Sequence, residues 1–477
     1  MRLVAVDQGT TSTRSLVINT SGHAQMAASV THQQYYPHNG WVEHDPNELL
    51  DAIKTCISAA GQVDAIGLAN QGESCLAWDA RDKRPLCPVI VWQDNRTADT
   101  VAQLKASGAE SLVQSISGLP LDSYFSASKL GWIIREIPAA RSLAASGHLR
   151  LGTTDAYFRD VLTNQFATDP STASRTALLN LTTGQWDKNL CELFEVPIDC
   201  LPAIRPTTGK LGICHIGGQS IPLAASVVDQ QAALYGHGCR AAGDGKITFG
   251  TGAFALMLTG EKPLLSSDSG LLPTIAWQHH GEAPVYALEG GVYTASAVIS
   301  WLERMGVIED LAALSPFEGE SPMRRGTVFV PALAGLACPY WRRDVRGSWL
   351  GLTLDTSRED LIRVALEGVA CRSAQVLNAI SQSGIALNQL GMDGGLAANT
   401  WFQQLMADVT GQTINVPSLG ELTAAGVLTL IADGMNAPLT MTHKIHQVRP
   451  KQDQSDLTEV LEKAITLTSQ WPQSEKA

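Results

Sequence analysis

Short apolar runs separated by polar, glycine-containing turns stand at the beginning and the middle of the chain. The runs Leu3–Val6 and Ser15–Ile18 flank a Gly/Thr/Ser turn, a pattern that predicts a β-hairpin. The same pattern returns where Gly250-Thr251-Gly252 joins Lys246–Phe249 to Ala253–Leu258. Because the two Gly-Thr turns lie about half the chain apart, we predict two domains of related architecture, residues 1–240 and 241–477.

Helices are predicted where apolar residues recur at every third or fourth position. One is expected over residues 356–380, with Thr356 and Glu359 as a capping box at its start. Another is expected over residues 400–410, ending at Gly411. Strands and helices alternate elsewhere, which indicates an α/β protein.

Composition and charge narrow the classes of function. Of the 477 residues, 44% are hydrophobic and 17% are charged, which excludes a disordered chain. The net charge of −12 offers no basic surface to nucleic acid, and no apolar run approaches the ~18 residues of a membrane span. Asp7 follows the first apolar residues too early for a signal peptide, so we expect a cytoplasmic protein whose nine scattered cysteines are reduced thiols.

Three glycine-rich turns have the composition of a nucleotide site. In the first, the backbone at Gly9, the hydroxyls that follow and Arg14 could hold a phosphate, and Asp7 could hold magnesium through its waters. The alternative is an ordinary polar turn. Gly250-Thr251-Gly252 is the second turn. In the third, residues 393–399, Asn399 either hydrogen-bonds a flat ring or caps the following helix.

Candidate acid–base and polyol-binding groups follow other apolar runs. Asp229 stands after Ile221–Val228, at the carboxyl end of a predicted strand, where α/β proteins place ligand chemistry. Its carboxylate could accept the proton of a hydroxyl that attacks a γ-phosphate, or it could cap the helix expected over residues 230–235. A polyol site also needs acceptors such as Glu73 and an aromatic ring such as Trp92, although a lone Trp is more often a core residue.

Ordered motifs along nearly the whole chain resemble the FGGY carbohydrate kinases, and within that family its glycerol-phosphorylating members. They are residues 7–14, 40–46, 90–94, 124–132, 173–176, 229–234, 249–252, 346–352 and 392–395. The resemblance implies a two-domain actin-like ATPase (ribonuclease H-like) fold with the active site in the interdomain cleft. It implies a kinase that uses ATP and Mg²⁺ to phosphorylate a terminal hydroxyl of a small polyol or sugar. We expect a homodimer or homotetramer.

The resemblance also implies a role for each matching position. Asp229 is then the catalytic base, and Asp7 is the carboxylate at the magnesium site. The phosphate and nucleotide positions are Thr10, Thr11, Ser12, Arg14, Thr251, Ser296, Ser300, Gly395 and Asn399. The substrate positions are Gly72, Glu73, Trp92, Tyr124, Asp229, Gln230 and Phe254.

Three departures from the glycerol-phosphorylating pattern bear on specificity. Gly72 replaces an Arg that binds glycerol hydroxyls, so a kinase for a four- or five-carbon polyol or ketose (erythritol, xylitol, ribulose or xylulose type) is the alternative. Ser296 and Ser300 replace Gly and Gln. The loop 215–220 lacks the Gly-Gly-Thr-Arg that binds fructose bisphosphate in regulated members.

Two rival classes predict different chemistry. A non-catalytic sugar sensor would not need the carboxylates Asp7 and Asp229, and this chain has both. An actin- or chaperone-like ATPase would turn over ATP without sugar, and it would leave the matches at Trp92 and Phe254 unexplained.

Overall fold

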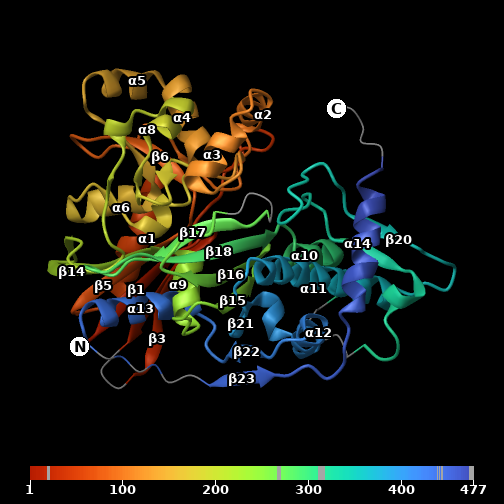
Figure 1. The fold of residues 1–477 in the computed structure, drawn as a ribbon. Coiled ribbons are helices and arrows are strands. Elements are labelled where there is room, and N and C mark those ends of the chain that lie inside the picture. The colour runs from red at the N-terminus through yellow and green to blue at the C-terminus, as the bar shows by residue number, and fades with distance from the viewer. Residues whose placement is uncertain are drawn as a thin grey trace.

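Two large mixed sheets form the frame of the molecule (Figure 1). The computed structural model describes residues 1–18, 22–265, 270–309, 317–437, 439, 441 and 444–471. The first sheet has the order β13 (Ile213–Ile216), β14 (Gln219–Val228), β5 (Ala65–Asn70), β1 (Leu3–Gln8), β2 (Ser12–Ile18), β3 (Ala24–Thr31). The second has the order β17 (Leu272–Trp277), β18 (Val285–Val292), β16 (Ala253–Gly260), β15 (Asp244–Phe249), β21 (Gln389–Gly394), β22 (Ile414–Pro417), β23 (Ile445–Val448).

The two sheets repeat one strand arrangement. An antiparallel hairpin, β1–β2 in the first and β15–β16 in the second, continues into a third antiparallel strand, β3 or β18. Two more strands run parallel to the first strand of the hairpin, β5 and β14 in one sheet and β21 and β22 in the other. Both predicted hairpins are therefore confirmed, and their Gly-Thr turns occupy equivalent places in the two sheets.

The first sheet is covered by helices on both faces. Alternate residues of β1 point to opposite sides, so Val4 and Val6 pack with α1 (Pro46–Ala59) and α6 (Thr154–Thr163). Leu3 and Ala5 pack with α9 (Asp229–Gly236) and α13 (Leu422–Gly434). This side-chain alternation fixes the register of the strand that carries Asp7.

Helix α13 belongs to the second half of the chain but packs on the first sheet, beside β1, β5 and α9 (Figure 1). Its contact with α9 is a crossing of two backbones. A Cβ atom at Gly426 would stand 1.8 Å from the carbonyl oxygen of Ala232, and one at Gly236 would stand 2.2 Å from that of Leu422. Only glycine fits at either position, because any side chain there would clash with the backbone of the other helix. The two glycines therefore allow the close approach of α9 and α13.

The helices of the second half confirm the sequence pattern, with one shift. Helix α11 runs over Arg358–Gln382, and its capping box is formed by Ser357 and Asp360 instead of Thr356 and Glu359. The predicted cap is displaced because the Thr356 hydroxyl accepts the Thr353 amide in the preceding turn. Helix α12 (Thr400–Thr410) ends at Gly411 in the left-handed conformation, as predicted.

The remaining elements form smaller layers around these sheets. A four-stranded sheet has the order β4 (Glu43–His44), β7 (Val89–Ile90), β6 (Cys75–Asp79), β8 (Leu149–Thr153). The remaining α-helices are α2 (Ala98–Ala106), α3 (Glu110–Ser117), α4 (Ser126–Glu136), α5 (Pro138–Ala145), α7 (Pro170–Ala173), α8 (Lys188–Leu193), α10 (Ser296–Arg304) and α14 (Asp456–Thr468). Three short strand pairs complete the structure: β9 (Ala167–Thr168) with β12 (Ala203–Ile204), β10 (Leu179–Asn180) with β11 (Gln185–Trp186), and β19 (Val328–Val330) with β20 (Ser348–Leu350).

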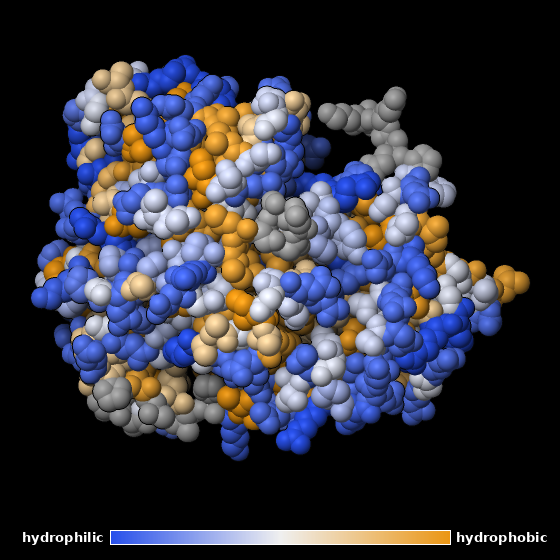
Figure 2. Space-filling model, viewed as in Figure 1, coloured by the Kyte–Doolittle hydropathy of each residue, from blue (hydrophilic) through white to orange (hydrophobic). Residues whose placement is uncertain are grey.

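Polar and apolar residues are sorted between surface and interior. Hydrophilic residues cover most of the face shown in Figure 2, interspersed with smaller hydrophobic areas. All nine cysteines are free thiols, eight of them buried, as the sequence predicts. None of the helices in the described part of the chain combines the length and the apolar character that crossing a membrane requires.

Candidate active site

A small cavity of about 170 Å³ lies between the two halves of the chain. It brings together nine of the predicted site residues: Thr10, Gly72, Glu73, Trp92, Tyr124, Asp229, Gln230, Thr251 and Phe254. Its lining also contains Gly250 and Gly252 of the second glycine-rich turn, and residues to which the sequence gave no role in the site: Arg175, Val228, Gln231, Thr248 and Glu289. The volume is below the roughly 300–1,000 Å³ of pockets for drug-sized ligands, so the cavity fits a small molecule.

Asp229 projects into this cavity from the beginning of α9. It is the first helical residue, while Val228 occupies the cap position, so the helix-cap alternative is wrong for Asp229. Its Oδ1 accepts the Gln230 amide at 2.7 Å. Burial, followed by the charge of Asp7, raises the pKa of Asp229 to about 7. A carboxylate with a pKa near neutrality suits a base that must both accept and release a proton.

Lys246 holds the neighbouring Gln230 in place. This lysine stands in β15, is fully buried, and donates from Nζ to Gln230 Oε1 at 2.6 Å and to Thr248 Oγ1 at 2.8 Å. Because its Oε1 is engaged by Lys246, the side-chain group of Gln230 that can still bind a ligand hydroxyl is its amide nitrogen. The sequence signal for Lys246 is a lysine within the strand that leads into the second Gly-Thr turn.

Three aromatic rings form one wall of the cavity. The half-buried Trp92 makes edge-to-face contacts with Tyr124, at 5.8 Å between ring centroids, and with Phe254, at 6.4 Å. Its indole N–H donates to Thr10 Oγ1 at 3.1 Å. Trp92 is therefore a cavity-lining residue that joins the aromatic wall to the first Gly-Thr turn, and its interpretation as a core residue is wrong.

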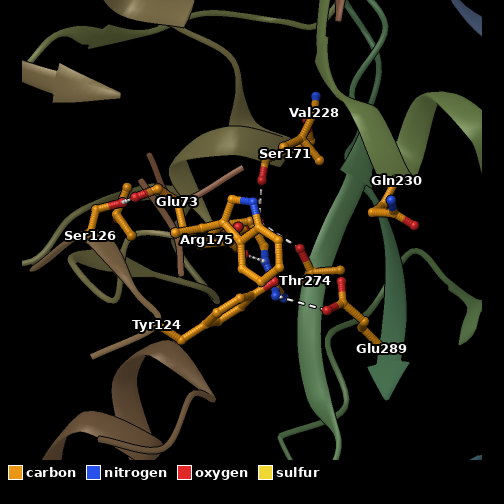
Figure 3. Close-up of polar contacts among 12 residues, drawn as sticks. Glu73, Tyr124, Ser126, Ser171, Arg175, Val228, Gln230, Thr274 and Glu289 are labelled. Carbon is orange, nitrogen blue, oxygen red and sulfur yellow. Dashed lines mark hydrogen bonds and ion pairs between the residues drawn. The ribbon is translucent and has the colours of Figure 1, made fainter. Parts of the chain in front are cut away.

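A buried ion-pair cluster lies beside the Tyr124 ring of this wall (Figure 3). Arg175, which follows α7, donates from Nε to Glu73 Oε1 at 2.6 Å and from Nη2 to Glu289 Oε1 at 2.9 Å. Glu289 lies in β18 of the second sheet, so the cluster joins the two halves of the chain. For Glu289 the sequence signal was a lone carboxylate in an apolar strand; Arg175 stood within a matching motif that had no assigned role.

Asp7 stands at the end of β1, beside the first Gly-Thr turn, and is half-buried. Burial and then the charge of Glu421 raise the pKa of Asp7 to about 7, while Arg14 opposes the shift. The Arg14 guanidinium pairs with Glu421 at 2.8 Å, on the surface. Asp7, Thr11, Ser12 and Arg14 do not line the cavity, although they belong to the hairpin whose Thr10 does.

Of the other predicted nucleotide positions, Ser296 and Gly395 lie next to the second Gly-Thr turn, and neither they nor Ser300 and Asn399 line the cavity. The carbonyl oxygens of Gly250 and Thr251 accept amides from residues 295–297 at the start of α10. Ser296 Oγ donates to the Phe249 carbonyl at 3.3 Å and lies 3.7 Å from where a Cβ at Gly395 would stand. Ser300 is exposed one turn further along α10. Asn399 caps α12, accepting the Phe402 amide at 2.9 Å.

The backbone at Gly72 lies against Val228. A Cβ atom at Gly72 would stand 3.0 Å from Val228 Cγ2, closer than ordinary van der Waals contact. The sequence suggested that Gly72 leaves free volume for a longer substrate. The structure shows that the first part of that volume is occupied by Val228, and the cavity remains small.

A cleft between two ribonuclease H-like halves, with the half-buried carboxylate of Asp229 beside paired Gly-Thr turns, defines a phosphotransferase of the ATP-using kinase class. The FGGY carbohydrate-kinase N-terminal domain matches residues 2–236, and the C-terminal domain of the same family matches residues 245–433. The chain therefore belongs to the FGGY family of carbohydrate kinases and is a glycerol-kinase-like enzyme that transfers phosphate to an alcohol group.

Individual relatives extend over nearly the full chain. Glycerol kinase from Citrifermentans bemidjiense is 40% identical over 91% of this chain and 90% of its own length. Glycerol kinase from Shewanella frigidimarina is 41% identical over 90% of this chain and 88% of its own length. The crystal structure of Plasmodium falciparum glycerol kinase with ADP has a TM-score of 0.88 at 29% identity, covering 98% of each chain.

More distant structures share the fold. A ligand-bound xylulose kinase from Lactobacillus acidophilus has a TM-score of 0.83 at 20% identity, covering 98% of this chain and 97% of its own. The predicted two-domain actin-like fold is confirmed by these neighbours. At this identity the likeness shows the fold alone, so it gives no support to the four- or five-carbon alternative.

Proposed function

We propose that this kinase phosphorylates a terminal hydroxyl of glycerol, with ATP as the phosphoryl donor. The observation that carries the proposal is the cavity itself. It is small, it places Asp229 beside Thr251, and it combines an aromatic wall with polar groups for hydroxyls. The identity to glycerol kinases over nine-tenths of the chain supports the same substrate.

Asp229 acts as the general base in this proposal. Its carboxylate takes the proton of the terminal hydroxyl as that oxygen attacks the γ-phosphorus, giving glycerol phosphate and ADP. Trp92 and Phe254 pack against the carbon chain, while Glu73 and Gln230 bind the hydroxyls that do not react. The phosphates lie against the two Gly-Thr turns, at Thr10, Thr11, Ser12 and Arg14 on one side and Thr251 on the other. Ser296, Ser300, Gly395 and Asn399 lie along the nucleotide.

The residues present fit a magnesium site at Asp7. Asp7 and Asp229 are half-buried carboxylates whose pKa values are both raised, by burial and by a neighbouring negative charge (Glu421 for Asp7, Asp7 for Asp229), and a bound cation would relieve this. No group of three or more ligating side chains occurs among the described residues, which suits an ion held by one or two carboxylates, waters and phosphates. When bound there, Mg²⁺ supplies neutralisation of phosphate charge.

A coupled assay across a panel of substrates tests the proposal. With ATP and Mg²⁺, kcat/KM is measured for glycerol, erythritol, xylitol, ribulose and xylulose, and ATP turnover is measured without any acceptor. Glycerol should give the highest kcat/KM. A higher value for another acceptor would refute the substrate, and acceptor-independent turnover would refute the kinase mechanism. The domain division at 240/241, the homodimer or homotetramer and the cytoplasmic location stay predictions.

A further inference from the structure

One buried donor atom of Arg175, a residue that lines the cavity, has no hydrogen-bond partner among the described residues. Arg175 is 1% exposed, and its Nε and Nη2 are bound by Glu73 and Glu289, but its Nη1 makes no hydrogen bond. The guanidinium lies between the two carboxylates, with the Tyr124 ring beside it (Figure 3). A buried donor without an acceptor is unfavourable unless a ligand supplies one.

The position of Arg175 relates this free donor to Gly72. Its guanidinium reaches Glu73, the residue directly after Gly72, and it lines the same cavity. Glu73 itself has a left-handed backbone, with φ of +56°, a conformation that few non-glycine residues adopt. The ion pair with Arg175 therefore holds a strained residue in place on the wall where the chain has no side chain at position 72.

The two carboxylates also fix the direction of the guanidinium. Because its fork is planar and rigid, two bound nitrogens determine where the third points. Phe125 and Tyr124 lie on its flanks, with ring centroids 5.7 and 5.8 Å from the guanidinium carbon. The direction of Nη1 is thus fixed before a ligand binds. Binding therefore needs little reorganisation of the Arg175 side chain.

We propose that Arg175 binds a non-reacting hydroxyl of the polyol through Nη1 and so supplies the guanidinium donor that Gly72 cannot. The inference rests on the proposed function, since it assigns a specificity-determining residue to the same substrate site. The hydroxyl completes the hydrogen bonds of Arg175, and the Glu73 and Glu289 carboxylates keep the donor in position.

The test combines a variant with deoxy substrates. Arg175→Lys keeps the positive charge between the two carboxylates but removes the third, directed donor. Values of kcat and KM are measured with glycerol, 1,2-propanediol and 1,3-propanediol, and the KM of ATP is measured alongside. Arg343→Lys is the matched control, because Arg343 also pairs across the two halves, with Asp122 at 2.7 Å, but does not line the cavity.

Loss of a hydrogen bond from a charged donor should lower kcat/KM for glycerol about 10- to 100-fold, mainly through KM. The diol that lacks the hydroxyl bound by Arg175 should lose less than about threefold, since it never had that bond. The KM of ATP should not change, and the control should behave like wild type. An equal loss for all three substrates, or no loss, would overturn the proposal.

A crystal structure of the wild-type enzyme with glycerol gives a second test that needs no variant. A hydroxyl oxygen should lie within about 3.2 Å of Arg175 Nη1. A polyol bound without this contact would overturn the proposal even if Arg175→Lys fails to fold. Should the wild type prefer another polyol, the proposed substrate is wrong, and the comparison is made with that polyol and its deoxy analogues.

Discussion

Replacing Asp229 by Asn should abolish most turnover and at the same time stabilise the protein. The amide cannot accept the hydroxyl proton, and loss of a positioned base costs about 10²–10⁴ in rate, or roughly 3–5 kcal/mol of activation free energy. The Asn side-chain oxygen can still accept the Gln230 amide, which Asp229 now accepts at 2.7 Å. The start of α9 and the binding of ATP should therefore be retained.

The gain in stability follows from the raised pKa of Asp229. The folded state holds its proton up to a pH of about 7, whereas the ordinary pKa of an aspartate is 3.8. Stability is therefore lost as the pH rises from 3.8 to about 7, by up to about 4 kcal/mol at 1.36 kcal/mol per pH unit. Asn stays neutral and avoids this loss, so the variant should unfold at a higher temperature at pH 8, with the difference shrinking towards pH 5.

Two measurements on one preparation decide this. Single-turnover kinetics with saturating ATP and glycerol give the chemical rate, and thermal unfolding from pH 5 to pH 8, without metal or nucleotide, gives the stability difference. Near-wild-type kcat would refute the role of Asp229 as base. A stability difference that does not change with pH would refute the raised pKa of Asp229.

Three further changes test other parts of the site. Thr251→Val should raise the KM of ATP with little effect on that of glycerol, since it removes a hydroxyl from the second Gly-Thr turn; a selective rise in the glycerol KM would place this turn outside the nucleotide site. Gly72→Arg should lower kcat/KM for xylitol more than for glycerol, because its side chain enters a wall where Cβ already lies 3.0 Å from Val228 Cγ2; an unchanged ratio of the two values would contradict this. Burial, followed by the charge of His32, lowers the pKa of His44 to about 4 from 6.5, so stability should fall as the pH drops from 6.5 to 4, by up to about 3 kcal/mol. His44→Asn should flatten this acid-side loss in thermal unfolding, and an equally steep loss in the variant would show that other groups cause it.

The sequence predicted those parts of the fold that depend on local patterns. The two hairpins are set by apolar runs around Gly-Thr turns, and α12 by its periodicity and the glycine at its end. The capping box of α11 shifted by one residue because a turn outside the helix engaged the Thr356 hydroxyl. That competition depends on the geometry of the preceding turn, which spacing alone does not specify.

The sequence does not show which partners the charged residues within strands will have. Glu289 lies outside every matching motif and meets Arg175 from a position 114 residues away along the chain. Lys246 stands next to the motif 249–252, but its partner Gln230 belongs to a different element. Their partners are determined by how the two sheets face each other. The effect of Gly72 likewise depended on Val228, from a different strand, so its consequence for cavity volume could be found only from the structure.

The glycine crossing of α9 and α13 has a consequence for how the polypeptide can be divided. A fragment cut near residue 240 would expose the face of the first sheet that α13 covers, including Leu3 and Ala5, together with the apolar side of α9. Such a fragment should aggregate when expressed alone and should become soluble when residues 422–434 are supplied as a separate peptide or fused to it. The amino-terminal half of this enzyme is thus completed by a segment that the ribosome makes only after most of the second half has been synthesised.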